Sequence, residues 1–391
     1  MRHTTALRLL FFLALFSSMG LSVWAEDNLP APPPVPVRAY ILTDFYSGEV
    51  LAQVDADTRM EPASITKLMT GYIVYKYLQE GRIKLTDPVP ISEKAWRAEG
   101  SRMFVQVGTQ VPLEALIMGM DIQSGNDATI ALAEYVAGSE EAFVELMNKE
   151  AARLGMNNTH FTNSAGLPNP EHYTTARDVA TLLRAIIGHF PEDYKRYSVR
   201  EFTYNNIRQQ NRNRLLDLDN SVDGGKTGHT SSAGYCLAAS AKRGDMRLIS
   251  VVLGAKLEKQ RVSATQALFN YGFTFYETQP VYAADKPLTT VRIWKGQINQ
   301  LPLGVIDGVY ATVPKGKFQE VQSSFQVAPG KIAAPVTRGA PFGTITVTRG
   351  DKTLTSTPLV ALQDVPLAGF FGRLWDTLWW PIYALFHWSS H

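Results

Sequence analysis

The sequence predicts an α/β domain, followed by a smaller all-β domain and a terminal amphipathic helix. Strand patterns stand at both ends of a mainly helical stretch between residues 38 and 277, so the sheet of this domain is expected to join segments distant in sequence. Short β-rich segments follow between residues 278 and 364, and residues 365–391 repeat apolar side chains with a helical period. A chain of 391 residues is also long for one hydrophobic core, which favours two domains.

The N-terminal segment, residues 1–25, has the three parts of a secretory signal. It starts with basic residues, continues with an apolar run over residues 9–16, and ends in small residues at Val23 and Ala25. The alternative is an uncleaved anchor, but this run is shorter than the ~20 residues that a membrane span needs. We therefore expect cleavage near Ala25. The prolines that follow predict an extended linker over residues 26–37.

The α/β domain is predicted from its strand and helix patterns. A hairpin of residues 38–44 and 50–54 opens it, and a helix over residues 64–80 follows, with Gly81 in the position of a C-terminal cap. Capping residues and helical periodicity predict further helices over residues 113–120, 126–136, 140–154 and 176–188. Two more strands and a helix are expected over residues 234–241, 247–254 and 261–271.

The all-β domain is predicted from four short segments separated by Gly, Pro, Asp or Lys. They are residues 290–294, 309–313, 318–327 and 344–348. Because no catalytic cluster occurs among them, we interpret residues 278–364 as a spacer or binding module.

Residues 365–391 predict an amphipathic helix that lies in the membrane interface. On a helical wheel most apolar side chains fall on one side, with Arg373 and Asp376 on the other and Trp380 as the main exception. The two charges argue against a membrane span, and the aromatic-rich stripe favours surface attachment. Pro381 is expected to kink the helix. The alternative is a helix packed on its own protein.

Composition excludes several classes of function. The formal net charge is only +2, which leaves no basic footprint for nucleic acid. The seven histidines show no paired ligand spacing, so no metal is expected, and nothing indicates a cofactor. Cys236, the single cysteine, stands in an apolar run and is expected to be a buried hydrophobic residue.

The first chemistry-bearing motif is Ser64-Ile65-Thr66-Lys67. A serine hydroxyl needs an adjacent base to act as a nucleophile, and positions i and i+3 share one face of a helix. Lys67 can therefore reach Ser64, provided that burial or nearby positive charge lowers its proton affinity. Free backbone N–H groups at the helix start could also stabilise an oxyanion.

The second motif is Ser124-Gly125-Asn126, on a predicted turn between two helices. Ser124 could relay a proton between Lys67 and a leaving nitrogen. Asn126 could donate a hydrogen bond to the amide carbonyl of a substrate. Taken alone, Ser-Gly-Asn is an ordinary turn sequence.

The third motif is Lys226-Thr227-Gly228, followed by His229, on a predicted edge strand whose glycines allow close approach to a ligand. Lys226 supplies positive charge for a substrate carboxylate, and Thr227 can donate a hydrogen bond to it. The backbone N–H of His229 could be the second oxyanion donor, opposite that of Ser64. Taken alone, this motif is typical of a glycine-rich turn with a solvated lysine.

The three motifs together are the set shared by penicillin-binding proteins and class A β-lactamases. The whole mature chain resembles the low-molecular-mass penicillin-binding proteins, the serine-type D-alanyl-D-alanine carboxypeptidase family. The β-rich second domain, the amphipathic tail and four further segments carry the resemblance; the segments are residues 61–64, 161–167, 222–230 and 247–252.

The resemblance implies a penicillin-binding/β-lactamase-like domain, with an antiparallel sheet and a helical subdomain. It implies Ser64 as the acyl-ester nucleophile and Lys67 as its proton acceptor. It implies Ser124 as the proton relay and Lys226 as a substrate contact, and it suggests Arg212 as a partner for the terminal carboxylate.

The implied activity is removal of the terminal D-alanine from peptidoglycan stem pentapeptides, with penicillins and other β-lactams as covalent inhibitors. With a signal at one end and a membrane-binding helix at the other, we expect a secreted protein held peripherally at the periplasmic face of the inner membrane.

Three other functions remain open. A D,D-endopeptidase that cuts peptidoglycan cross-links is close, although the added β domain and tail favour the carboxypeptidase. A class A β-lactamase needs a Glu-x-x-x-Asn pattern, but residues 171–175 read Glu-His-Tyr-Thr-Thr. A peptidoglycan-binding scaffold with decayed motifs is disfavoured because no motif residue is missing.

Overall fold

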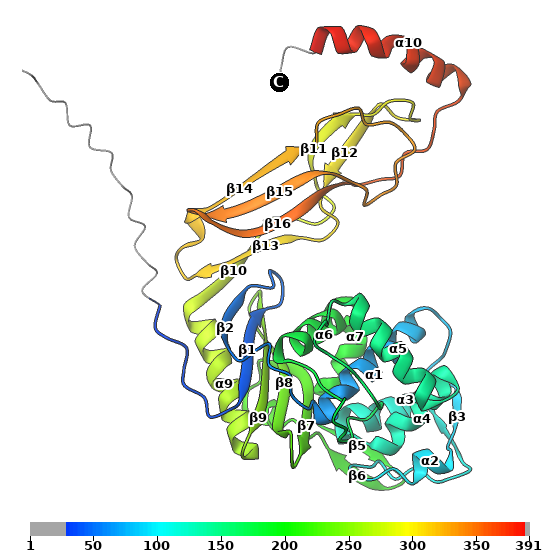
Figure 1. Ribbon diagram of the computed structural model, residues 1–391, viewed down its shortest axis with the longest axis vertical. Coiled ribbons are helices and arrows are strands. Elements are labelled where there is room, and N and C mark those ends of the chain that lie inside the picture. Colours follow the sequence, from blue (N-terminus) through cyan, green and yellow to red (C-terminus); the bar gives the residue numbers. More distant parts are fainter. Residues whose placement is uncertain (1–28, 388–391) are drawn as a thin grey trace, which may run out of the picture.

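The computed structural model describes residues 29–387. An α/β domain, a β domain and a terminal helix follow one another along an elongated molecule (Figure 1). The predicted signal, residues 1–25, and the last four residues of the terminal segment lie outside the described residues. Residues 29–35 contain no helix or strand, and the Tyr271 hydroxyl donates a 3.1 Å hydrogen bond to the carbonyl oxygen of Pro30.

The α/β domain is built on a five-stranded antiparallel sheet in the order β2-β1-β9-β8-β7. Its strands are β1 (Ala39–Asp44), β2 (Val50–Val54), β7 (Val222–Thr230), β8 (Gly234–Arg243) and β9 (Met246–Ala255). Since β1 pairs with β9, the first strand joins a partner some 200 residues later, as the sequence predicts. Strand β7, which carries the third motif, lies at the edge of the sheet, also as predicted.

The two faces of this sheet support two separate cores. Ile41 of β1 belongs to a core shared with helices α1 and α6, whereas the neighbouring Leu42 belongs to a core shared with α9. This alternation follows from the period of two along a strand. Gly272 lets α9 approach the sheet, because a Cβ there would lie 2.6 Å from Cδ1 of Leu248.

Each predicted helix of this domain has a counterpart in the structure, and three short helices, over residues 93–96, 191–194 and 215–218, were not predicted. The α-helices of this domain are α1 (Lys67–Gln79), α2 (Glu93–Trp96), α3 (Leu113–Met118), α4 (Asn126–Ala137), α5 (Glu140–Arg153), α6 (Ala176–His189), α7 (Pro191–Tyr194), α8 (Leu215–Leu218) and α9 (Glu258–Phe275). The predicted helix over residues 64–80 opens with a 3-10 turn, η1 (Ala63–Thr66), and another 3-10 turn, η3 (Lys195–Ser198), follows α7. The predicted helix over residues 113–120 continues into a π-helical turn, η2 (Gly119–Gln123).

Two small hairpins were not predicted: β3 (Pro88–Pro90) with β4 (Gln110–Pro112), and β5 (Glu201–Tyr204) with β6 (Ile207–Gln210).

The β domain contains a five-stranded sheet in the order β11-β12-β16-β15-β14, and a separate pair of β10 with β13. The strands are β10 (Tyr276–Tyr282), β11 (Pro287–Arg292), β12 (Gln300–Gly304), β13 (Val309–Pro314), β14 (Val321–Val327), β15 (Pro341–Arg349) and β16 (Lys352–Ala361), with a short 3-10 turn, η4 (Phe318–Glu320), before β14. This arrangement confirms the all-β prediction for the second part of the chain.

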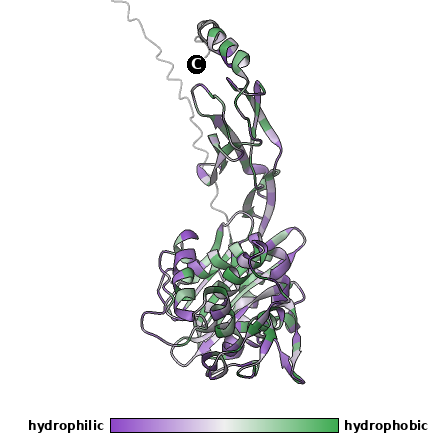
Figure 2. Cartoon of the chain, turned by 90° about the vertical axis from the view of Figure 1, so that its right-hand side faces the viewer, coloured by the Kyte–Doolittle hydropathy of each residue, from purple (hydrophilic) through white to green (hydrophobic). Residues whose placement is uncertain are grey.

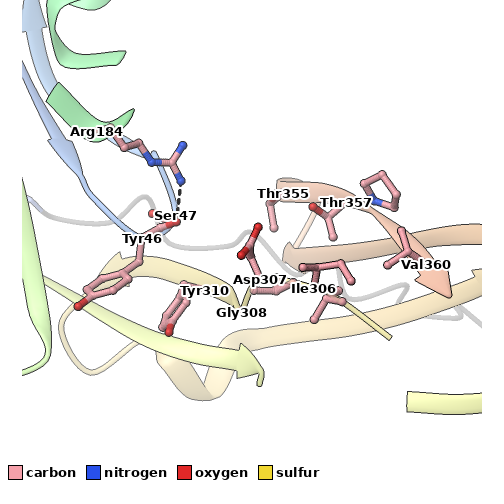
Figure 3. A pocket seen from close by; sticks show the side chains of 13 residues that line it. Tyr46, Ser47, Arg184, Ile306, Asp307, Gly308, Tyr310, Thr355, Thr357 and Val360 are labelled. Atoms are coloured by element: carbon pink, nitrogen blue, oxygen red, sulfur yellow. Dashed lines mark hydrogen bonds between the residues drawn. The ribbon is translucent and has the colours of Figure 1, made fainter. Parts of the chain in front are cut away.

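The two domains meet around the turn after β1. The carboxylate of Asp44 accepts a 2.7 Å hydrogen bond from Thr278, and the Ser47 and Thr312 hydroxyls lie 2.6 Å apart. Beside this junction Arg184 faces Asp307 across a hollow of about 410 Å³ (Figure 3). None of the predicted site residues lines it.

The terminal helix α10 (Phe370–His387) presents apolar side chains to solvent. Figure 2 shows hydrophobic segments inside the α/β domain and again in this helix at the far end of the molecule. Trp375 and Leu378 are each 63% exposed, whereas Asp376 is buried and bonds to Arg292 (3.1 Å) and to the backbone N–H of Lys295. The helix therefore attaches to the β domain through its acidic residue. Among residues 29–387, no helix combines the length and apolarity that crossing a bilayer requires.

Candidate active site

Ser64 lies in the 3-10 turn that opens helix α1, and its side chain is partly exposed. The preceding residue, Ala63, has a φ of +47°, which costs a non-glycine residue about 1–2 kcal/mol. The Thr66 hydroxyl helps to hold this turn, because it donates a 2.8 Å hydrogen bond to the carbonyl oxygen of Ala63. The same hydroxyl lies 2.8 Å from Nε2 of the buried His172. Ser64 therefore lies on a strained turn that contacts of the Thr66 hydroxyl support.

Lys67 has a fully buried side chain whose Nζ atom has three partners. Nζ lies 3.0 Å from Oγ of Ser64, 2.7 Å from Oδ1 of Asn126 and 2.6 Å from the carbonyl oxygen of Ala165. Burial, and then the charge of Lys226, hold the pKa of Lys67 well below its usual value.

This set of partners fixes what a neutral Lys67 can do. Two of the partners, the amide oxygen of Asn126 and the carbonyl of Ala165, can only accept hydrogen bonds. They take both N–H bonds of a neutral amine and leave its lone pair for the Ser64 hydroxyl. A deprotonated Lys67 is therefore oriented as a base towards Ser64.

The carbonyl of Ala165 is positioned by a tight turn. The Asn163 side chain accepts hydrogen bonds from the backbone N–H groups of residues 165, 166 and 167, at 3.2, 2.7 and 2.9 Å. Gly166 has a φ of +86°, and a Cβ there would lie 1.8 Å from the carbonyl oxygen of Ala63. Only glycine allows this turn to lie against the nucleophile. The sequence assigned no role to Ala165, because a backbone carbonyl leaves no signature in a motif.

The second motif follows the π-helical turn η2. Ser124 adopts the left-handed conformation with a φ of +64°, and its buried Oγ has no hydrogen-bond partner. The Asn126 amide is oriented by its partners, since Oδ1 accepts from Lys67 and Nδ2 donates to the carbonyl of Glu99 at 2.5 Å. One amide proton of Asn126 is left for a further acceptor.

The loop over residues 99–105 is held against this motif by Asp127. Its carboxylate accepts hydrogen bonds from the backbone N–H groups of Met103, Phe104 and Val105, at 2.9, 2.8 and 3.2 Å. It also accepts one from the N–H of Ala128 at 2.9 Å. Four donors thus offset the charge of this buried carboxylate.

The third motif runs along the edge strand β7 next to the nucleophile. A Cβ at Gly228 would lie 3.1 Å from the backbone nitrogen of Ser64, so glycine brings the strand close to the Ser64 N–H. Thr227 is buried, and the exposed His229 ring stacks on Tyr235 with ring centroids 4.0 Å apart. Strand β7 and helix α1 thus converge at the serine.

Lys226 is 1% exposed, and its Nζ makes one hydrogen bond of 3.3 Å, to the carbonyl oxygen of Thr227. Burial lowers the pKa of Lys226 to about 7. The charge of Asp121 opposes this shift, whereas the charges of Arg212 and Arg261 reinforce it. Arg212 itself is exposed.

The structure joins the predicted residues to different degrees. Hydrogen bonds connect Ser64, Lys67 and Asn126 directly, and Gly228 packs against the serine backbone. Electrostatic interactions connect Lys67 with Lys226, and Lys226 with Arg212. The structure thus brings these six predicted residues together, whereas the buried hydroxyl of Ser124 has no hydrogen-bond partner.

Two charged residues near this site were not predicted. Arg261 of α9 is buried and donates a 3.4 Å hydrogen bond to the carbonyl oxygen of Gly228. Asp121 of η2 is buried, and burial raises its pKa to about 7. The signal for Asp121 was a lone acid in the apolar run Leu116–Ile122. Cys236 is buried, as predicted. Residues 29–387 contain no cluster of side chains suited to a metal ion.

Comparisons with known proteins agree with this arrangement. The profile of peptidase family S11, described as D-alanyl-D-alanine carboxypeptidase, matches residues 26–257. The profile of the penicillin-binding protein 5 C-terminal domain matches residues 276–367.

Individual relatives match over nearly the whole chain. The D-alanyl-D-alanine carboxypeptidase DacC of Escherichia coli is 44% identical over 93% of this chain and 92% of its own length. DacA of the same organism is 42% identical over 94% of both chains. The crystal structure of penicillin binding protein 5 from Haemophilus influenzae superposes with a TM-score of 0.78 at 41% identity, covering 86% of this chain and 99% of that one.

The structure and the comparisons agree. A serine and a buried lysine share one helical turn, and the edge strand of an antiparallel sheet carries Lys226-Thr227-Gly228. The chain is also similar to D-alanyl-D-alanine carboxypeptidases over nearly its whole length, including the β domain. The chain therefore belongs to the D-alanyl-D-alanine carboxypeptidase family, the low-molecular-mass penicillin-binding proteins of peptidase family S11.

Proposed function

We propose that this chain removes the terminal D-alanine from peptidoglycan stem pentapeptides through an acyl-enzyme on Ser64. The observation that carries the proposal is the environment of Lys67. Its buried Nζ faces the serine hydroxyl, and two acceptors, Asn126 Oδ1 and the Ala165 carbonyl, take the N–H bonds of the neutral amine. A base is thereby held 3.0 Å from the nucleophile.

In the first half of the reaction, Ser64 Oγ attacks the carbonyl between the two D-alanines and its proton passes to Lys67 Nζ. The negative charge that forms on the carbonyl oxygen is stabilised by the backbone N–H groups of Ser64 and His229. The C–N bond then breaks as Ser124 donates its hydroxyl proton to the leaving D-alanine nitrogen and receives in exchange the proton held by Lys67. The buried Oγ of Ser124 has no other partner, which suits a transient relay.

In the second half, water attacks the acyl ester while Lys67 accepts one of its protons. The C–O bond to Ser64 then breaks, and Lys67 passes that proton to the Ser64 oxygen, which restores the hydroxyl. The products are a tetrapeptide stem and free D-alanine. Penicillins present a reactive amide with a nearby carboxylate, so they acylate the same serine.

The terminal carboxylate of the substrate is held at β7. Thr227 donates a hydrogen bond to it, Lys226 supplies charge from beneath, and the exposed Arg212 supplies charge from the solvent side. The remaining amide proton of Asn126 binds the substrate's own amide carbonyl.

The location proposed for this reaction is the periplasmic face of the inner membrane, reached by secretion and held by α10. The support is the exposure of Trp375 and Leu378 together with the burial of Asp376 against the β domain. A helix packed on its own protein would bury the first two and expose the third. The β domain, residues 278–364, is then a spacer between the membrane surface and the active site.

One assay tests the activity and separates it from its alternatives. The wild type and Ser64→Ala are incubated with labelled penicillin, with a pentapeptide that ends in D-Ala-D-Ala, and with cross-linked peptide dimers. The wild type is expected to release D-alanine and to retain the penicillin label, and Ser64→Ala to do neither. Opening of dimers without D-alanine release would make it an endopeptidase, and rapid turnover of penicillin a β-lactamase.

A further inference from the structure

Asp121 is a buried acid in the turn that leads into the second motif. It belongs to the π-helical turn η2, three residues before Ser124, and is 2% exposed. Its Oδ2 accepts a 2.6 Å hydrogen bond from the Tyr75 hydroxyl of α1, whereas Oδ1 is buried without a hydrogen-bond partner. Burying a carboxylate with incomplete hydrogen bonding is costly. None of the catalytic steps above gives this residue a task.

The groups around Asp121 come from several elements. The 3-10 turn η3 packs against both η2 and strand β7, and it contributes Arg196 and the buried Tyr197, whose hydroxyl interacts with Asp121 and Tyr75. The cations that act on Asp121 are Lys226 and Arg196. The charges that act on Lys226 are those of Asp121, Arg212 and Arg261.

The site contains two buried lysines that need opposite charge states. Lys67 must be neutral to accept the serine proton, and Lys226 must be charged to attract a carboxylate. In its charged form Lys226 has three N–H donors, but its Nζ makes only one hydrogen bond, of 3.3 Å, within the described residues. Hydrogen bonds alone therefore do not favour the charged form of Lys226 over that of Lys67, whose Nζ has three partners.

The acids near the two lysines are not equivalent. Asp127, which acts on Lys67, already accepts hydrogen bonds from four backbone N–H groups. Asp121, which acts on Lys226, accepts one short hydrogen bond, from Tyr75, and interacts with the Tyr197 hydroxyl as its only other donor among residues 29–387. The negative charge of Asp121 is therefore less offset by hydrogen-bond donors than that of Asp127, and it interacts more strongly with a neighbouring cation.

We propose that Asp121 is a positioning residue that places the site's positive charge on Lys226 and so leaves Lys67 neutral as the base. This inference rests on the proposed function, because it concerns the same two lysines. Asp121 touches neither the nucleophile nor the substrate, and it acts through Lys226.

The directions of the pKa shifts agree with this role. The Asp121 carboxylate raises the pKa of Lys226 against the effect of burial, and the ammonium of Lys226 lowers the pKa of Lys67. Removal of the Asp121 charge therefore lowers the pKa of Lys226. Because Lys226 then carries less charge, the pKa of Lys67 rises. The pH range in which Lys67 is neutral and Lys226 charged must narrow from both sides.

The test is Asp121→Asn in the full chain, which removes the charge and keeps the shape. Rates of D-alanine release from the pentapeptide are measured as a function of pH. The acidic limb, which reports Lys67 and appears in kcat, is expected to move to higher pH. The basic limb, which reports Lys226 and appears in KM, is expected to move to lower pH. A shift of one pH unit is about a tenfold loss of rate on that limb.

Two further variants make the result specific. Tyr75→Phe removes the 2.6 Å hydrogen bond that the Tyr75 hydroxyl donates to the carboxylate and so raises the pKa of Asp121. It is expected to move the acidic limb alone, in the same direction. Asp57→Asn removes an exposed aspartate that pairs with Arg177 away from the site, and both limbs should stay in place.

Wild-type positions of both limbs in folded Asp121→Asn would overturn the inference. Should that variant fail to fold, an unshifted acidic limb in Tyr75→Phe would overturn it instead. Loss of activity in Ser64→Ala together with unshifted limbs in Asp121→Asn would leave the proposed function standing and remove this inference alone.

Discussion

Gly166 packs against Ala63 so closely that any side chain at position 166 would collide with the backbone of the nucleophile turn. A Cβ there would lie 1.8 Å from the Ala63 carbonyl oxygen, and the φ of +86° is itself unfavourable for other residues. We therefore predict that Gly166→Ala moves the Ala165 carbonyl away from Lys67 and slows acylation by labelled penicillin at least tenfold. The strained φ adds a loss of stability of about 1–2 kcal/mol, measured by denaturant unfolding.

Gly188→Ala is the matched control for this prediction. Gly188 lies inside helix α6, and a Cβ there would have no atom within 4 Å. Alanine is a better helix former than glycine by about 1 kcal/mol. This variant should acylate at the wild-type rate and unfold at slightly higher denaturant. Equal acylation rates in the two variants would contradict the role given to the Ala165 carbonyl as a partner of Lys67.

Lys67→Arg tests whether the residue acts as a base or only as a cation. A guanidinium keeps its proton at any accessible pH, so the variant retains positive charge but cannot accept the Ser64 proton. General-base catalysis contributes about 10²–10⁴-fold, and the acylation rate is expected to fall by that factor at every pH from 6 to 9. A variant rate that recovers with rising pH, as the wild-type rate does, would show that another group takes the proton.

The fold was predictable where local signals agree with tertiary packing. Helices α5 and α6 follow Ser139 and Thr175, whose side chains cap their N-termini as the sequence predicts. Strands β12 and β16 were missed because Pro302 and Pro358 stand inside them, and proline is a signal against a strand interior. The π-helical turn η2 was missed because it depends on packing, since a Cβ at Gly119 would lie 2.3 Å from the sulfur of Met103.

The site was predictable in its side chains and not in its backbone groups. Ser64, Lys67 and Asn126 are joined by hydrogen bonds, and their spacing in the chain anticipates the proximity of the first two. The Ala165 carbonyl is supplied by a turn almost a hundred residues later, and any residue type offers such a carbonyl. The charge on Lys226 depends on burial and on Asp121, and neither can be read from a three-residue motif.

His172 predicts a loss of stability in mild acid. Burial, followed by the charges of His160 and Lys67, lowers the pKa of His172 from 6.5 to about 4. The folded protein thus holds His172 neutral, while the unfolded chain binds a proton below pH 6.5. The contribution of neutral His172 to the free energy of unfolding is fully present above pH 6.5. It is lost as the pH falls towards 4, and the total loss is about 3 kcal/mol.

The measurement is denaturant unfolding of the wild type and His172→Gln between pH 7 and pH 4. The variant has no titrating ring, so its stability should fall less over this range by up to about 3 kcal/mol. Parallel curves for the wild type and His172→Gln would contradict the assignment.

The exposed apolar side of α10 predicts reversible membrane binding that can be weakened one side chain at a time. Transfer of a side chain of this size out of water contributes about 1.5–3 kcal/mol, so Leu378→Ser should lower partitioning onto anionic vesicles about tenfold or more. Leu218→Ser removes an equally exposed leucine, 63% in both cases, from helix α8 of the α/β domain and should bind as the wild type does. Truncation after Leu362 should abolish vesicle sedimentation and leave penicillin acylation intact, because the site lies wholly within the α/β domain. A truncated chain that still sediments with vesicles would assign membrane binding to a different part of the protein.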